Sequence, residues 1–191
     1  MNRYVLSAIR MAVLTLVVLG LVYPLAVTGL AQVLMPAQAN GSLVSKSGVV
    51  VGSSLIGQAF TDAKYFHGRP SAAGADGYDA TASSASNLAP TSKTLVGSVA
   101  SRVASAVAEN PGLKAGSVPV DMVTASGSGL DPDITLANAY AQVTRVASAR
   151  GISNDAVRKL VEDAAKGRQF GFLGEPRVNV LMLNLSLDLA K

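Results

Sequence analysis

The sequence predicts an α+β domain outside the cytoplasm, tethered by one N-terminal transmembrane helix. The anchor is predicted by residues 11–35, which contain no charged side chain. As a helix this segment would be roughly 37 Å long, and about 20 apolar residues already cross a bilayer. The fold class is predicted by residues 36–191, where helical and strand-like patterns mix without a regular strand–helix–strand rhythm.

The apolar segment has two other interpretations, a cleaved signal peptide and a buried core helix. Ala37-Gln38-Ala39 resembles a signal-peptide cleavage site, but the apolar core of a signal peptide is typically about 7–15 residues long. A buried core helix rarely avoids charge over such a length. The sequence therefore favours an uncleaved anchor.

The flanking charges predict the orientation. Arg3 and Arg10 precede the segment, and the next basic residue is Lys46. Because basic residues concentrate on the cytoplasmic side of a membrane, residues 1–10 are expected to be cytoplasmic and residues 36–191 extracytoplasmic.

The composition excludes several classes of site. Setting aside Arg3 and Arg10 leaves 14 basic and 12 acidic residues, without a block of like charge, so no nucleic-acid partner is expected. The absence of cysteine excludes disulfides, thiolate metal sites and cysteine nucleophiles. No metal site is expected either, since His67 is the only histidine and the aspartates lack the spacing of a calcium loop.

Three residues of the anchor suggest a second role in helix packing. Pro24 cannot donate a hydrogen bond to the carbonyl of Gly20, so a kink is expected there. Gly20 is small enough for close helix contact, and Gln32 places an amide in the bilayer segment. The alternative is a plain anchor that tolerates a proline.

The first half of the domain is predicted to be rich in loops. Residues 37–47 resemble a linker, and residues 49–51 with 55–56 resemble a short strand or hairpin around Gly52-Ser53. Residues 67–92 are rich in Ser, Ala, Gly and Asp and are expected to form a long loop.

Three helices are predicted from N-caps followed by apolar stripes. The N-caps are Thr91, Asp131 and Ser153, and Gly151 ends the second helix. The stripes are Val96, Val99, Val103 and Val107; Leu136, Tyr140, Val143 and Ala147; and Val157, Leu160, Val161 and Ala164. Strands are predicted at residues 118–123 and, from alternating leucines, at residues 177–189.

The sequence contains few motifs that would support a catalytic or nucleotide-binding site. A Ser-His-Asp triad would have to use His67, and no Gly-x-Ser-x-Gly elbow is present, so an anchored hydrolase is a minor alternative. Gly127-Ser128-Gly129 lacks the Gly-Lys-Ser/Thr of a phosphate loop and predicts a tight turn. Weak nucleotide-binding candidates are Leu55, Gly57 and Gln58, which resemble the end of an ABC-ATPase signature.

Four separated segments together resemble the C subunit of the Kdp potassium-transporting ATPase: residues 65–71, 83–91, 118–132 and 174–181. The sequence departs from the family where His67 replaces a usual Trp and where Ala85 and Ala89 replace usual glycines. It also departs at Asp133, which follows Asp131-Pro132 in place of a usual His or Glu.

The resemblance implies a non-catalytic accessory subunit of an inner-membrane potassium uptake complex. Its partners would be a channel-like potassium-binding subunit and a P-type ATPase subunit, which it would assemble and stabilise as a catalytic chaperone for ATP use. No cofactor is expected to bind directly, and ATP would act only through the ATPase subunit. The alternative is a nucleotide-binding regulatory subunit that contacts ATP.

Two polar, glycine- and serine-rich segments, residues 65–90 and 124–131, are predicted to dock on the potassium-binding subunit. The alternative for Arg69 and Asn87 is that they only tie the long loop to its own domain. The docking candidates are Tyr65, Phe66, Arg69, Asn87, Ser126, Gly127, Gly129 and Asp131.

Overall fold

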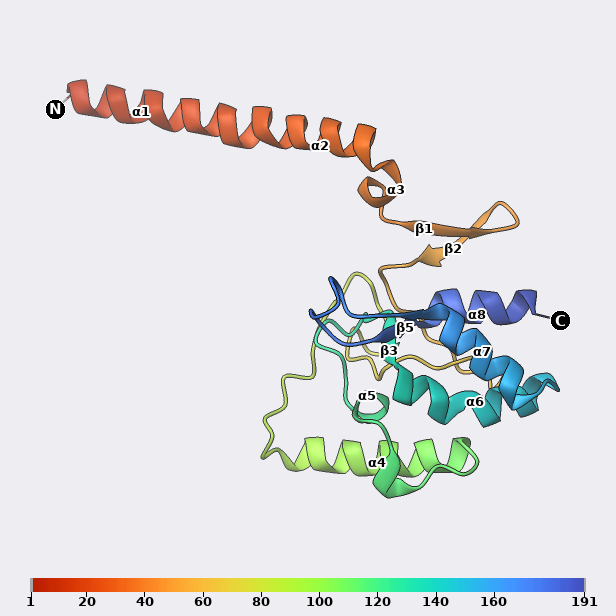
Figure 1. The fold of residues 1–191 in the computed structure, drawn as a ribbon. Coiled ribbons are helices and arrows are strands. Elements are labelled where there is room, and N and C mark those ends of the chain that lie inside the picture. Colours follow the sequence, from red (N-terminus) through yellow and green to blue (C-terminus); the bar gives the residue numbers. More distant parts are fainter. Residues whose placement is uncertain (1, 191) are drawn as a thin grey trace. The chain divides into compact units, whose positions relative to one another are not determined.

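The computed structural model describes residues 2–190 and contains two compact units that divide between Ser53 and Ser54 (Figure 1). The first unit holds the long N-terminal helix and a small hairpin. The second unit holds the helices and strands that follow Ser53 and contains the hydrophobic core. The α+β class predicted for the region after the anchor is confirmed.

The N-terminal helix consists of α1 (Asn2–Val17), a π-helical turn η1 (Val18–Val22) and α2 (Tyr23–Leu34). Among the described residues it is the one helix long and apolar enough to cross a membrane, from Arg3 to Leu34. The π-helical turn lies immediately before Pro24, and the N–H of Tyr23 donates to the carbonyl of Val18. A wider turn relieves the clash between the proline ring and the preceding turn. The distortion predicted at Pro24 therefore takes the form of a π-helical turn.

The first unit continues with α3 (Pro36–Ala39) and an antiparallel hairpin of β1 (Leu43–Lys46) and β2 (Val49–Ser53). The prediction of a linker over residues 37–47 and of a turn at Gly52-Ser53 was wrong. The chain turns at Ser47 (φ 52°) and Gly48 (φ 80°), and two successive residues with positive φ suit a tight hairpin.

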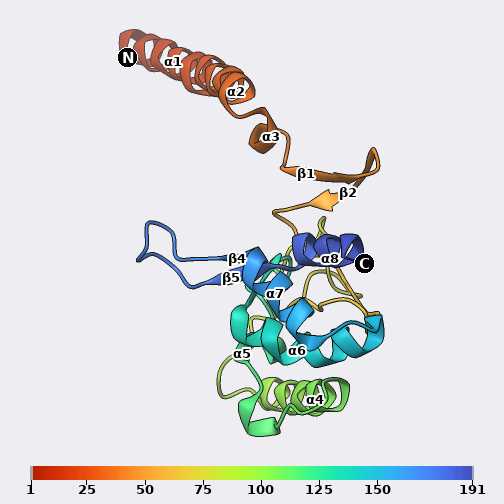
Figure 2. The same ribbon diagram turned by 45° about the vertical axis from the view of Figure 1, so that its right-hand side comes forward.

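In the second unit, a three-stranded antiparallel sheet has the order β3 (Asp133–Thr135), β5 (Arg177–Asn179), β4 (Ala165–Lys166). Helices α6 (Leu136–Arg150), α7 (Asn154–Ala164) and α8 (Val180–Leu189) pack around it (Figure 2). The core is made by Phe66, Ile134, Ala139, Val143, Val146, Ala147, Val157, Val161, Val178, Val180, Leu183 and Leu187.

The predicted N-caps are correct for one helix of three. Ser153 caps α7, and Gly151 ends α6 in the left-handed conformation, as expected. The cap of α6 is Thr135 and not Asp131, because residues 133–135 pair with β5 and are extended. The cap of α4 (Lys93–Glu109) is Ser92, one residue after the predicted Thr91.

The apolar stripe predicted for α4 is only partly correct. Val99, Val103 and Val107 are half-buried, whereas Val96 is 63% exposed. Ala106 is the one buried residue of α4, so the helix packs against the rest of the second unit through a small side chain.

The strand predicted at residues 118–123 was wrong, because the chain forms η2 (Ala115–Ser117) and then α5 (Val120–Val123). The helical turn places the buried carboxylate of Asp121 where it accepts hydrogen bonds from Thr135 N (2.8 Å), Thr135 Oγ1 (3.0 Å) and Asn138 Nδ2 (3.1 Å). The turn therefore supports the start of α6.

The strand predicted at residues 177–189 was correct only for residues 177–179, which form β5, and wrong for the rest. After Asn179 the chain becomes α8, and the Asn179 side chain caps the helix by accepting from Met182 N. The alternating leucines concealed a helical stripe in which Val180, Leu183, Asn184 and Leu187 are buried. Leucine also favours helices over strands.

Residues 54–92 contain no helix or strand, as predicted for most of this stretch. This segment, the long loop, enters the core through Phe66 and lies against the turn that precedes β3.

Candidate docking site

The structure brings the two predicted docking segments together. In the long loop, the carbonyl of Pro70 accepts from Ser126 N (3.2 Å), and Ser71 Oγ donates to the carbonyl of Gly129 (2.6 Å). Further along the same loop, Ser84 N donates to the carbonyl of Ser128 (3.0 Å). Residues 70–84 and 124–131 therefore form one continuous surface, which we call the loop cluster.

Gly129 is required where these segments meet. Its φ of 69° is unfavourable for residues with a side chain. An added Cβ would lie 2.6 Å from the carbonyl oxygen of Ser84 and 2.8 Å from Cβ of Ala73. The predicted docking residue Gly129 therefore acts by close backbone contact inside the cluster.

Arg69 and Asp131, both docking candidates, form an ion pair with each other. Arg69 Nη1 lies 3.0 Å from Asp131 Oδ2, and the two side chains are 25% and 30% exposed. Arg69 Nη2 donates to the carbonyl of Ala125 at 3.5 Å, whereas Nε is buried without a hydrogen-bond partner among the described residues. The guanidinium thus ties the long loop to the 124–131 turn.

Tyr78 also holds Arg69 in place, through the backbone of that residue. Its hydroxyl donates to the carbonyl of Arg69 at 2.5 Å, and a Cβ at Gly68 would lie 2.5 Å from the same hydroxyl. Burial, followed by the negative charge of Asp131, raises the pKa of Tyr78 to about 12. The phenol therefore remains a neutral donor at physiological pH. Tyr78 was not among the residues predicted from the sequence.

The docking candidates differ in accessibility. Asn87 and Gly127 are exposed, and a Cβ on Gly127 would meet no atom within 4 Å. Ser126 is buried, and Phe66 is fully buried in the core. The Phe66 side chain is therefore inaccessible to a partner. Gly127 is the exposed docking candidate within the loop cluster, and Asn87 is exposed three residues beyond its first segment.

Tyr65 lies apart from the 124–131 turn. Its hydroxyl donates to Asp188 Oδ2 at 3.3 Å, and its ring packs 5.0 Å from the Arg150 guanidinium. Arg150 in turn forms an ion pair with Asp188 at 2.9 Å. Tyr65 therefore fastens the long loop to α6 and α8.

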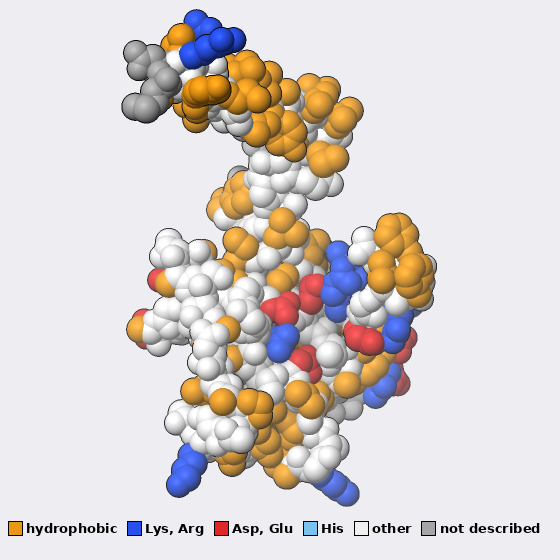
Figure 3. Space-filling view, turned by 90° about the vertical axis from the view of Figure 1, so that its left-hand side faces the viewer, with side chains coloured by type: hydrophobic (Ala, Val, Ile, Leu, Met, Phe, Trp, Pro, Cys, Tyr) orange, Lys and Arg blue, Asp and Glu red, His pale blue; other side chains and the backbone are white. Residues whose placement is uncertain are grey.

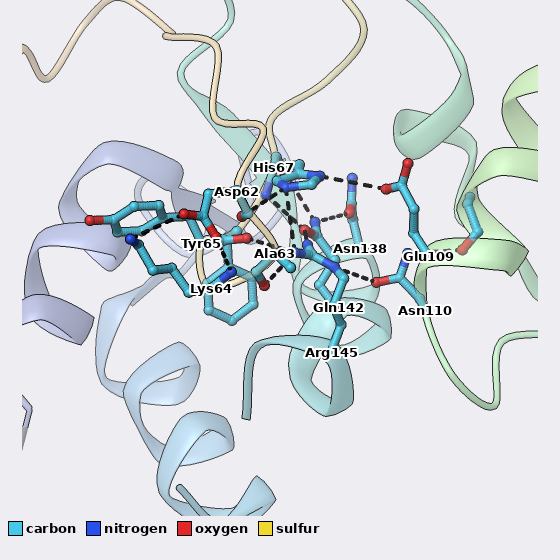
Figure 4. Close-up of polar contacts among 12 residues, drawn as sticks. Asp62, Ala63, Lys64, Tyr65, His67, Glu109, Asn110, Asn138, Gln142 and Arg145 are labelled. Atoms are coloured by element: carbon cyan, nitrogen blue, oxygen red, sulfur yellow. Dashed lines mark hydrogen bonds and ion pairs between the residues drawn. The ribbon is translucent and has the colours of Figure 1, made fainter. Parts of the chain in front are cut away.

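A buried polar network fixes the backbone of residues 63–67 (Figure 4). Arg145 on α6 donates through Nη1 to the carbonyls of Ala63 (2.7 Å) and Tyr65 (3.0 Å), and through Nη2 to Gln142 Oε1 (2.6 Å). The same Gln142 amide accepts from His67 N (2.7 Å) and donates to His67 O (3.1 Å). These side chains give an irregular backbone the partners that a strand would otherwise supply.

Asn184 on α8 completes this attachment. Its Oδ1 accepts from Phe66 N (2.8 Å), and its Nδ2 donates to Phe66 O (3.0 Å). Asn184 is 2% exposed. It was not identified from the sequence, because the strand predicted from alternating leucines placed it on the face opposite them.

His67 sits at the edge of the network, half-buried. Nε2 lies 3.2 Å from the Asp62 carbonyl oxygen and 3.4 Å from Arg145 Nη1, and Nδ1 lies 3.7 Å from Glu109 Oε2. Burial, and then the positive charge of Arg145, lower the pKa of His67. The ring lines a cavity of about 280 Å³ that Arg69 and Tyr78 also border.

The weak nucleotide candidates lie beside the 124–131 turn. Gly57 N donates to the carbonyl of Leu130 (2.8 Å), and a Cβ at Gly57 would lie 2.5 Å from the carbonyl oxygen of Asp131. Leu55 is exposed and Gln58 is half-buried. The space beside Gly57 is therefore occupied by the chain's own backbone at Leu130 and Asp131.

The predicted helix-packing residues belong to the first unit. A Cβ on Gly20 would meet only Leu16 within 4 Å, so this side of the helix is open. The amide of Gln32 exchanges hydrogen bonds with Asn40 at 3.0 and 3.3 Å. Gln32 thus has a partner within its own unit.

Among the described residues, acidic and basic side chains gather on one face (Figure 3). A second cavity, of about 360 Å³, is bordered by Asp131, Asp133 and Arg177. The carboxylates are neutralised locally, because Arg177 Nε lies 2.8 Å from Asp133 Oδ2 and Arg69 holds Asp131. No group of three or more His, Cys, Asp or Glu among the described residues is placed to hold a metal ion.

Comparison with known proteins identifies the family. A family model described as "K+-transporting ATPase, c chain" matches residues 5–189. Similar curated proteins carry the name potassium-transporting ATPase KdpC subunit. The protein from Acidobacterium capsulatum is 57% identical over 182 residues, covering 95% of this chain and 96% of its own length.

Two further relatives with the same name have similar coverage. The protein from Gemmatimonas aurantiaca is 55% identical over 188 residues, covering 98% of this chain and 94% of its own length. The protein from Mycobacterium tuberculosis is 55% identical over 188 residues, with coverage of 98% and 99%. The chain therefore belongs to the KdpC family, the c chain of K+-transporting ATPases.

Proposed function

We propose that this chain is a non-catalytic accessory subunit that assembles and stabilises the potassium-binding and P-type ATPase subunits of a potassium uptake complex. Its family supports membership of a K+-transporting ATPase. The observation that carries the accessory role is the loop cluster, where two polar segments are fastened into one preformed surface by Arg69–Asp131 and Ser71–Gly129. Preorganised loops suit recognition because less conformational freedom is lost on binding.

The docking face is proposed to comprise the exposed part of this cluster, around Gly127, together with the exposed Asn87 that follows it in the long loop. Its partner is the extracytoplasmic surface of the potassium-binding subunit. Arg69 and Asp131 act indirectly in this proposal, by fixing the shape of the loops. An exposed backbone bordered by small residues allows a partner to approach closely and exchange main-chain hydrogen bonds.

The chain is proposed to reside in the inner membrane with its N-terminus in the cytoplasm. The span from Arg3 to Leu34 and the basic residues near its start support this orientation. Protease added to intact spheroplasts should then digest the domain from outside. Digestion only after access from the cytoplasmic side would contradict this topology.

ATP is proposed to act only through the ATPase subunit, with this chain as a catalytic chaperone. With the domain outside the cytoplasm, its influence must pass through the membrane helix or through the stability of the complex, as a coupling between separate sites. The close packing of Gly57 against Leu130 and Asp131 supports a structural use of the residues that resembled a nucleotide motif.

Affinity purification in mild detergent tests the proposed function. The tagged chain should bring down both larger subunits, and a strain lacking this chain should yield little assembled ATPase. The purified chain alone should hydrolyse no ATP and show no saturable binding of labelled ATP. A fully assembled and active ATPase in the absence of this chain would overturn the accessory role.

A further inference from the structure

A projecting hairpin in the second unit has no part in the proposed function. Residues 166–177, which we call the aromatic finger, are exposed at every position. The finger extends from the paired strands β4 and β5 and leaves the body of the second unit (Figure 2).

The tip of the finger is apolar. Phe170 is 79% exposed, Phe172 is 70% exposed, and Leu173 is 47% exposed. Transfer of two phenyl rings out of water is strongly favourable, so an aromatic tip of this kind marks a surface that becomes covered.

The tip is also held in a defined shape. Gln169 and Leu173 exchange two backbone hydrogen bonds of 2.9 Å. Arg168 Nη2 donates to both carboxylate oxygens of Glu175, at 2.9 and 2.8 Å. Phe170 has a φ of 54°, in the left-handed region that non-glycine residues rarely adopt. Backbone strain held in place by its surroundings is typical of segments with a binding role.

The base of the finger is basic. The finger contains three basic residues, Lys166, Arg168 and Arg177, and one acidic residue, Glu175. Arg177 is paired with Asp133 and Arg168 with Glu175, so among the described residues Lys166 supplies the unpaired positive charge of the base. An apolar tip above a positively charged base matches the boundary between acyl chains and anionic headgroups.

We propose that the aromatic finger inserts Phe170 and Phe172 into the interface of the bilayer that the chain's own helix spans. Lys166 and Arg168 then lie at the level of the anionic headgroups. The observations favour a lipid surface because the basic base complements anionic lipid and because the anchor keeps the domain near the bilayer. The finger would be a second attachment point, which restricts the orientations of the domain.

The test uses the absence of cysteine from the chain. Phe170→Cys places one thiol at the tip, and Val120→Cys is the matched control because Val120 is 72% exposed on α5. Each full-length variant is labelled with a bimane fluorophore and reconstituted into vesicles of phosphatidylethanolamine and phosphatidylglycerol that contain spin-labelled lipid. A Phe172→Cys variant provides a second site should labelling at position 170 disturb the turn.

The label at position 170 or 172 should emit at shorter wavelength and be quenched several-fold more by spin-labelled lipid than the label at position 120. Replacement of phosphatidylglycerol by phosphatidylcholine should reduce that quenching. Equal quenching at all sites would overturn the proposal. So would loss of lipid quenching with a retained blue shift when the labelled chain is assembled with the other subunits, because a protein pocket would then be the occupant.

Discussion

At the scale of single residues, the long loop is held by polar side chains that come from distant parts of the chain. Arg69 was predicted to grip a partner, with a tie to its own domain as the alternative. The ion pair with Asp131 and the contact with the Ala125 carbonyl support the alternative for the guanidinium. The proposed docking role therefore falls to exposed neighbours such as Gly127.

Arg69→Ala should reduce the free energy of unfolding by about 1–2 kcal/mol, because it leaves the half-buried Asp131 without its partner. Arg168→Ala is the matched control, since its pair with Glu175 is exposed and should contribute at most about 0.5 kcal/mol. Denaturant unfolding of the purified chain in detergent measures both values. Equal losses in the two variants would argue against a structural role for Arg69.

His67 should make the fold sensitive to acid. Because burial and Arg145 lower its pKa in the folded state, the unfolded chain takes up the proton first as the pH falls. The contribution to stability is therefore complete above the ordinary pKa of 6.5 and is lost as the pH falls from there toward the lowered value.

His67→Gln should remove this dependence. The melting temperature should fall less between pH 7.5 and pH 5.5 in the variant than in the unmodified chain. The comparison cancels the titration of carboxylates that the two proteins share. An identical pH dependence in both would exclude His67 as its source.

The sequence could not reveal most of the residues that hold the site. Asn184 binds the backbone of Phe66 across 118 positions, and Arg145 binds that of Ala63 across 82. Periodicity and capping patterns report neighbours within a few residues, so buried polar contacts between distant segments leave no local signal. Tyr78 was also missed, because it lies in a loop without a pattern.

At the scale of elements, α8 illustrates how a short apolar segment misleads. Alternating leucines over residues 183–189 fit a strand, yet Leu183 and Leu187 share one buried face of a helix while Leu189 is 79% exposed. Helix α7 was predicted correctly, with its N-cap at Ser153. Helix and strand patterns are hard to separate when nearly every residue is apolar.

Two alanine substitutions distinguish these structures. Leu187→Ala should cost about 2–5 kcal/mol because it leaves a cavity in the core. Leu189→Ala should cost at most about 0.5 kcal/mol, because its side chain is mostly in water. A strand would place both leucines on the same face, so equal large losses in thermal unfolding experiments would contradict the helix.

The N-terminal helix contains a π-helical turn, η1, just before Pro24. Replacing residues 11–35 by polyleucine should keep the domain outside the cytoplasm but weaken co-purification with the larger subunits. The physical reason is loss of the small residue Gly20 and of the local helix geometry, both suited to close helix packing. Co-purification at the original yield would show that the domain alone is sufficient for assembly.

At the scale of the whole molecule, the sequence predicted the fold class, the single apolar span and the family. It also predicted that two polar segments would act together, and the structure places them in contact through Ser71–Gly129 and Ser84–Ser128. It did not predict the aromatic finger, because isolated phenylalanines in a loop do not reveal their exposure. Exposure depends on the path of the backbone. Over residues 166–177 the backbone leads away from the core, so these residues are exposed.

One matched pair of variants is the sharpest test of docking through the surface around Gly127. Gly127 and Gly116 are both exposed, and an added Cβ at either position meets no atom within 4 Å. Lysine at either position should therefore leave the melting temperature unchanged. Gly127→Lys should reduce co-purification of the potassium-binding subunit several-fold, while Gly116→Lys should leave it intact. Equal recovery of that subunit with both variants would contradict the docking surface.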